Sequence, residues 1–344
     1  MSEFTYTGFM HRAMDIYAQH GSAAAHHFVC EHVEDGQANP AQLYNLQYSL
    51  RAACGRKEEA LALLKEAVLE KGYWYSPDYL LDDEDLSELR DEPGFEQVVA
   101  VCRDREAQAI AQSTAALQIV LPDDEQSPSS LRTLFVLHGE LENNEAVEPV
   151  WKPALDRGYK LALLQSSQVQ FSDAYDWNDM EQASGELEHA MMELARIDSG
   201  LPVAGEPESA TERAQEHMQD GERTTAPFTA HKPVLAGFSA GARVALYTAG
   251  LYPAAAAGLI LVAPWLPHPE EWQEALNDWK EHGMKLYMIC GEHDEDCRPG
   301  VEELAAELKA RDIPHVLHML PGLEHNYPVH FTDLLQQAVD WMQA

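Results

Sequence analysis

The sequence has few basic residues for its length. Its 344 residues include 23 lysines and arginines against 58 aspartates and glutamates, which gives a formal net charge of −35. A negative field of this strength repels nucleic acids and anionic membrane surfaces and favours solubility. The charge therefore argues against a nucleic-acid partner, and it disfavours highly anionic substrates.

Cysteine and long apolar runs are also scarce. The five cysteines are widely spread and form no C-x-x-C pair, so the sequence indicates neither a zinc site nor a disulfide framework. No run of eighteen apolar residues could cross a membrane, and no basic flank precedes an apolar core at the start of the chain. We expect a cytoplasmic protein with no membrane span, no metal and no other cofactor.

One motif that is present carries most of the information. The apolar run Val234 to Ala236 leads into Gly-Phe-Ser-Ala-Gly at residues 237–241, and a helix-forming run follows. A G-x-S-x-G between a strand and a helix is the pattern of a nucleophile elbow, whose tight turn needs small neighbours on both sides of the serine. A glycine-rich strand-to-helix turn in any α/β protein could look the same, so the motif depends on its partners elsewhere.

Three further polar groups each follow a predicted strand. His138-Gly139 ends the run LFVL, Gly-Glu-His-Asp at 291–294 follows the strand 285–290, and His325 follows the strand 315–320. Open α/β sheets place their sites outside the carboxyl ends of their strands. The sequence therefore predicts that these groups gather with Ser239 at one edge of a sheet.

Residues from about 115 to 344 resemble the α/β-hydrolase fold through the motifs LFVLHG, GFSAG, GEHDEDC and PGLEHNYP. The likeness is greatest to the esterase, phospholipase/carboxylesterase and dienelactone-hydrolase-like branches. It implies a mostly parallel sheet flanked by helices, with Ser239 as nucleophile, His325 as general base and Asp294 as orienting acid. The implied function is hydrolysis of a small carboxylic ester, with thioesters as an extension, through an acyl-serine intermediate.

Two backbone N–H groups are candidates for the oxyanion hole. That of Ala240 follows the nucleophile, as in this family, and that of Glu140 follows His138-Gly139. The loop Glu-Leu-Glu-Asn-Asn at 140–144 is bulkier and more acidic than the glycine-rich loops of many relatives. At this position the chain therefore departs from the pattern of those relatives.

The acid and the base both have rivals nearby. Glu292 and Asp296 share the loop of Asp294, and spacing from Gly291 favours Asp294. His318 lies within a predicted strand, and His293 adjoins the acid and should point elsewhere. His138 more often supports an oxyanion loop than reacts.

Aromatic residues near the predicted strand ends are candidates for the substrate pocket. They are Phe238 in the elbow, Trp177 in the segment SSQVQFSDAYDW and Trp265 after the strand 259–263. Buried packing is an equal alternative for Trp177. Residues 198–231 interrupt the expected short connection, and a flexible surface excursion is favoured over a lid.

Residues 1–112 form a separate α-helical domain in this interpretation, and 113–344 form the catalytic domain. Small and large residues match a tetratricopeptide-like helix pair at Tyr44, Tyr48, Gly55, Ala60, Leu64 and Ala67. Such a domain could pack on the hydrolase, mediate self-association, bind a protein partner or roof the active site. Two other functions stay open, namely a peptidase of the prolyl-oligopeptidase type and a non-catalytic interaction protein.

Overall fold

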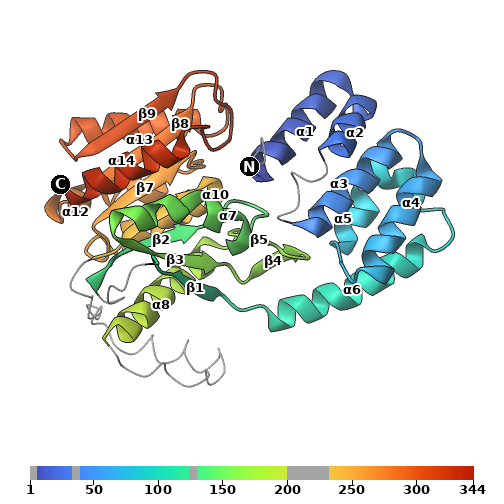
Figure 1. Ribbon diagram of the computed structural model, residues 1–344, viewed down its shortest axis with the longest axis horizontal. Helices are drawn as coiled ribbons and strands as arrows, with labels where there is room; N and C mark the ends of the chain where they lie inside the picture. Colours follow the sequence, from blue (N-terminus) through green and yellow to red (C-terminus); the bar gives the residue numbers. More distant parts are fainter. Residues whose placement is uncertain (1–5, 33–38, 124–129, 200–231) are drawn as a thin grey trace.

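A twisted sheet forms the centre of the larger half of the molecule (Figure 1). The computed structural model describes residues 6–32, 39–123, 130–199 and 232–344. Its seven strands lie in the order β1-β3-β2-β6-β7-β8-β9. They are β1 Ala116–Val120, β2 Arg132–Leu137, β3 Tyr159–Gln165, β6 Val234–Phe238, β7 Gly258–Val262, β8 Lys285–Gly291 and β9 His315–Leu320. Within this sheet, only the edge strand β1 pairs antiparallel to its neighbour.

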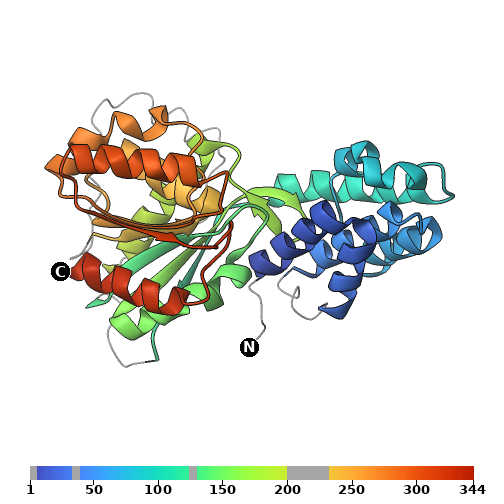
Figure 2. The same ribbon diagram turned by 90° about the horizontal axis from the view of Figure 1, so that it is seen from above.

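Helices cover both faces of the sheet, which is why its central strands are apolar on both sides. Every residue of β6 and β7 is buried, and Figure 2 shows the sheet edge-on between two layers of helices. One layer holds α8 Met180–Asp198, α10 Ser239–Leu251, α11 Glu270–Gln273, α12 Leu276–Glu281 and α13 Arg298–Ala310. The other holds α7 Asn144–Trp151, the 3-10 helix η5 Lys152–Arg157 and α14 Phe331–Gln343. The predicted fold class is confirmed.

The N-terminal part is helical, as predicted. Its elements are α1 Tyr6–His20, α2 Ser22–Glu31, α3 Pro40–Ala53, α4 Lys57–Lys65, the π-helical turn η2 Glu66–Glu70, α5 Pro77–Asp82, the 3-10 helix η3 Glu84–Leu89 and α6 Phe95–Gln112. Tyr48, Ala60 and Leu64 are fully buried between these helices. Gly55 turns the chain between α3 and α4 with a φ of 72°. The helix pair is therefore present, while the tetratricopeptide name for it stays a prediction.

The segment 166–177, which carries the pocket candidate Trp177, contains a two-stranded hairpin. Its strands are β4 Gln168–Phe171 and β5 Ala174–Asp176. The hairpin leaves the hydrolase half, and Val169 and Phe171 pack against the core of the helical part. At its tip Ser172 donates its N–H to the carbonyl of Trp74 at 3.2 Å and accepts the N–H of Trp74 at 2.8 Å. The two halves are thus joined by this hairpin as well as by the chain after α6 (Figure 1).

Asn39 links the same hairpin to the start of α3. Its Oδ1 accepts the N–H of Gln42 at 3.1 Å, which caps the helix, and its Nδ2 donates to the carbonyl of Asp173 at 3.1 Å. Asn39→Ala is expected to lower the free energy of unfolding by about 2 kcal/mol, since the cap and a buried hydrogen bond are lost together. Urea denaturation measures this, with the exposed Asn277→Ala as the matched control. Equal stability of the two variants would contradict the link.

Some of the sequence-based expectations concern the long connections and the absence of a membrane span. Residues 200–231, nearly all of the predicted excursion, lie outside the described residues. Among the described helices, none is long and apolar enough to cross a bilayer.

Candidate active site

Ser239 lies at the turn between β6 and α10 with a φ of 52°. This left-handed conformation is strained for a residue other than glycine and is typical of a nucleophile elbow. A Cβ on Gly237 would lie 2.6 Å from the carbonyl carbon of Gly241, and a Cβ on Gly241 would lie 2.3 Å from the carbonyl oxygen of His138. Both positions therefore require glycine, and the His138 loop packs directly on the elbow.

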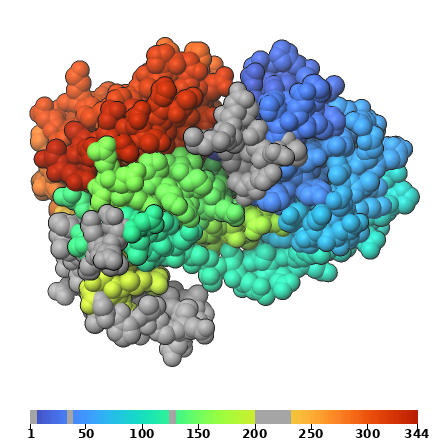
Figure 3. Space-filling view, in the orientation of Figure 1, coloured from blue at the N-terminus to red at the C-terminus, as the bar shows by residue number. Residues whose placement is uncertain are grey.

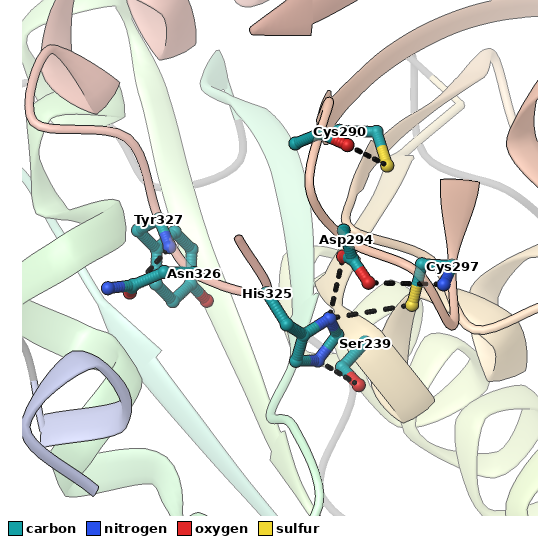
Figure 4. A network of polar contacts seen from close by, with 8 residues as sticks. Ser239, Cys290, Asp294, Cys297, His325, Asn326 and Tyr327 are labelled. Carbon is teal, nitrogen blue, oxygen red and sulfur yellow. Dashed lines mark hydrogen bonds and ion pairs between the residues drawn. The ribbon is translucent and has the colours of Figure 1, made fainter. Parts of the chain in front are cut away.

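Three side chains meet at this elbow in a hydrogen-bonded row (Figure 4). The Oγ of Ser239 is 2.9 Å from Nε2 of His325, and Nδ1 of His325 is 2.8 Å from Oδ2 of Asp294. They come from the carboxyl ends of β6, β9 and β8. Ser239 is 8% exposed and Asp294 is 2% exposed, so the row is largely shielded from water.

The environment of Asp294 keeps this carboxylate ionised. Burial raises its pKa, but the hydrogen bond and positive charge of His325, together with the N–H of Cys297 at 3.1 Å, outweigh burial and hold the pKa below its usual value. An ionised Asp294 accepts the proton on Nδ1 of His325. Nε2 is then free to accept the hydroxyl proton of Ser239.

Cys297 is a member of the cluster that the sequence did not single out. Its buried Sγ lies 3.4 Å from Nδ1 of His325. Among the described residues, Asp294, Cys297 and His325 offer metal-ligand atoms within 4.8 Å of one another. Burial raises the pKa of the Cys297 thiol. Since His325 and Asp294 also bind each other, the cluster suits a hydrogen-bonded row better than a metal site.

The predicted oxyanion donors lie on two sides of the elbow. The N–H of Ala240 belongs to the first turn of α10, where N–H groups have no acceptor within the helix. Glu140 follows Gly139 in the loop that packs on Gly241. The two N–H groups are therefore carried by two backbone segments that meet at Gly241, two residues after Ser239.

His138 supports the loop after β2 through both nitrogens of its ring. Its buried ring donates from Nδ1 to the carbonyl of Gly139 at 2.8 Å, and Nε2 accepts the N–H of Ser166 at 3.2 Å. Burial lowers the pKa of His138 to about 4. With both nitrogens engaged, His138 supports the loop and does not face Ser239 as a base.

The three aromatic pocket candidates differ in position. Trp177 is 2% exposed and donates its Nε1–H to the carbonyl of His138 at 2.9 Å, so it takes the packing alternative rather than lining a pocket. Phe238 is equally buried, with its ring centroid 4.9 Å from that of His325, and it backs the imidazole. Trp265 is 42% exposed beneath the Arg243 guanidinium, and it remains a candidate for substrate contact.

The rival residues lie away from the row. Glu292, His293 and Asp296 are exposed at the surface of the β8–α13 loop. His318 accepts or donates a hydrogen bond with the hydroxyl of Tyr287 at 2.8 Å within the sheet. Of the carboxylates in that loop, it is Asp294 that meets His325.

Both halves of the chain match a model of a known protein family. Residues 5–110 match the family model "A/B hydrolase-like, N-terminal domain", and residues 132–335 match "alpha/beta hydrolase fold". A search of curated proteins gives no match.

Solved structures similar to this chain include one that spans its whole length. It is an uncharacterized protein from Bacillus cereus ATCC 10987, with 35% identity, 99% of both chains covered and a TM-score of 0.49. The Bacillus cereus carboxylesterase has 17% identity over 70% of this chain and 98% of its own, with a TM-score of 0.43. Zea mays acyl-protein thioesterase 2 has 16% identity over 67% and 99%, also with a TM-score of 0.43. Since a single family model matches more than half of its length, this chain belongs to the α/β-hydrolase fold family.

Proposed function

We propose that the protein is a serine hydrolase that cleaves small carboxylic esters, and by extension thioesters. The observation that carries this proposal is the row from the Oγ of Ser239 through both nitrogens of His325 to Asp294, at 2.9 and 2.8 Å. A serine hydroxyl is a weak nucleophile until a neighbouring base takes its proton. This row supplies the base and the carboxylate that orients it.

The reaction follows from these contacts in two halves. His325 takes the proton of Ser239 as the oxygen attacks the ester carbonyl, and the resulting imidazolium is stabilised by Asp294. The N–H groups of Ala240 and Glu140 are the proposed donors to the oxyanion. The imidazolium then gives its proton to the leaving alcohol, and an acyl group remains on Ser239. Water, activated by the same imidazole, releases the acid and restores the serine.

The proposed division into residues 1–112 and 113–344 is supported by the end of α6 at Gln112 and the start of β1 at Ala116. The low exposure of Ser239 favours a small substrate that can reach a shielded hydroxyl. A peptidase of the prolyl-oligopeptidase type is less favoured, because helices, rather than a propeller, precede the sheet in the described residues.

Labelling with a fluorophosphonate probe tests the nucleophile. In the wild-type protein the Ser239 oxygen is expected to attack the phosphorus of the probe, displace fluoride and keep the phosphonyl group. Ser239→Ala should not label. Ser184→Ala is the matched control, because the buried Ser184 hydroxyl has no hydrogen-bond partner among the described residues. A folded wild-type protein that does not label would refute catalysis by serine, and labelling of Ser239→Ala would show that another residue reacts.

Nitrophenyl esters and peptide nitroanilides then separate the candidate functions. Ester cleavage without anilide cleavage supports the esterase. Comparable cleavage of both supports the peptidase, and cleavage of neither supports the interaction protein. An ester series of increasing acyl length measures the size of the acyl pocket.

A further inference from the structure

One face of helix α1 lies against the candidate active site. Thr7, His11 and Asp15 are spaced four residues apart, which places them on the same side of the helix. Phe9 and Ala13, on the other side, are buried in a core with α2 and α3. In the space-filling view the N-terminal helices abut the half that carries the sheet (Figure 3).

Each residue of this face meets a different part of the site. The hydroxyl of Thr7 donates to Oε1 of Glu142 in the loop after β2. The ring centroid of His11 lies 5.2 Å from that of His325. The carboxylate of Asp15 raises the pKa of the neighbouring carboxyl of Glu324, the residue before His325. Helix α1 therefore contacts both the loop of the oxyanion donor and the loop of the base.

Glu142 closes the turn that carries Glu140. Its Oε2 accepts the N–H of Gly139 at 2.8 Å, and its own N–H donates to the carbonyl of Gly139 at 3.2 Å. Within this turn Leu141 has a φ of 58°, which is a left-handed conformation that is unfavourable for a leucine. The carboxylate and the backbone of one residue thus hold a strained four-residue turn.

The carboxylate of Glu142 is buried, with the residue 5% exposed. Burial raises its pKa, and this effect exceeds the opposing effects of the bonds from Thr7 and Gly139 and of the charge of His325. A buried carboxylate is costly unless donors satisfy its oxygens. Here one donor comes from the turn and the other from helix α1, so the site of Glu142 is complete only when the N-terminal part is docked.

We propose that Glu142 is a positioning residue for the oxyanion turn, and that Thr7 on helix α1 holds its carboxylate in place. The inference rests on the proposed function, since it assigns the turn a role in stabilising an oxyanion. Donors accelerate a reaction only when they point at the developing charge beforehand. The N-terminal helical part then contributes to the active site by holding the turn that carries the N–H of Glu140.

Glu142→Ala and Glu142→Gln test the carboxylate. Alanine leaves the buried N–H of Gly139 without its acceptor, so kcat for a nitrophenyl ester is expected to fall about 10- to 100-fold while KM changes less than about 3-fold. Glutamine can accept from Gly139 with its oxygen and donate to Thr7 with its amide. Most of the wild-type kcat should therefore return in Glu142→Gln.

Thr7→Val and Thr7→Ser test the contact with helix α1. Valine removes the donor at nearly constant volume and is expected to lower kcat about 3- to 10-fold, and serine should restore it. Thr248→Val is the matched control, because the buried Thr248 hydroxyl has no hydrogen-bond partner among the described residues. Its kcat should equal that of the wild type.

A boronic acid that forms a tetrahedral adduct on Ser239 separates positioning from general destabilisation. Its affinity should fall in step with kcat across the variants, while the melting temperature of Glu142→Gln stays near that of the wild type. If the wild type labels with the fluorophosphonate, two results would overturn the inference about Glu142 and leave the proposed function standing. One is a wild-type kcat in Glu142→Ala, and the other is an equal loss of kcat in Glu142→Ala and Glu142→Gln. A wild type that neither labels nor cleaves esters overturns both proposals.

Discussion

Replacing His325 with alanine is expected to lower kcat for a nitrophenyl ester by about 10⁶-fold. Nε2 of His325 is the group 2.9 Å from the Ser239 hydroxyl, and without it the serine must lose its proton to water. Residues of such a row act as a unit, so the losses are not additive. The double variant Ser239→Ala/His325→Ala should therefore be no slower than either single variant. Steady-state kinetics at saturating ester measures all three.

The control for this prediction is His293→Ala, one residue from the proposed acid. The His293 side chain is exposed, and its removal should leave kcat within about 3-fold of the wild type, as for most surface substitutions. If His293→Ala lost as much activity as His325→Ala, the assignment of the base would be wrong. Additive losses in the double variant would instead mean that Ser239 and His325 act independently.

Acid is expected to destabilise the fold through His138. Burial lowers the pKa of this imidazole from 6.5 to about 4, so the unfolded chain takes up the proton at a higher pH than the folded protein. Stability from this group is fully present above pH 6.5 and is lost as the pH falls towards 4. The shift corresponds to roughly 3 kcal/mol of unfolding free energy. Protonation would also place an N–H on Nε2 against the N–H of Ser166.

Urea denaturation between pH 7 and pH 4 measures this loss. His138→Gln has no titrating group at position 138, so its free energy of unfolding should decline less steeply over the same pH range, whatever that free energy is at pH 7. His282→Gln, at an exposed position on the surface, should keep the wild-type slope. Asp294 does not obscure the test, because its pKa is held below 3.8 and its stabilisation is lost at lower pH. Identical slopes for wild type and His138→Gln would contradict the prediction.

The sequence predicts the sheet well because its signals are local. The strand at 315–320 has the predicted bounds, since it is a short run ended by turn residues. The motif order also leads to Ser239, His325 and Asp294, the side chains that lie in one row. Their catalytic roles stay predictions until they are tested.

The features that the sequence does not reveal depend on distant partners. The hairpin at 168–176 has only the short alternation Gln-Val-Gln-Phe to indicate a strand, and its apolar residues find their core in the helical part. Glu142 looks like a surface acid in an acidic chain, yet its partner Thr7 lies 135 residues away. Trp177 is packed in the main hydrophobic core and donates its N–H to the carbonyl of His138. No local pattern carries these contacts.

The contact between His11 and His325 joins helix α1 to the loop after β9, two segments far apart in the sequence. Bringing together segments so far apart in sequence carries a loop-closure cost that the contact must offset. During synthesis the first helix is complete long before the loop that carries the base. We therefore expect the surroundings of His325 to be complete only after helix α1 has docked on the part that carries the sheet, which makes the row of Ser239, His325 and Asp294 sensitive to how well these two parts dock.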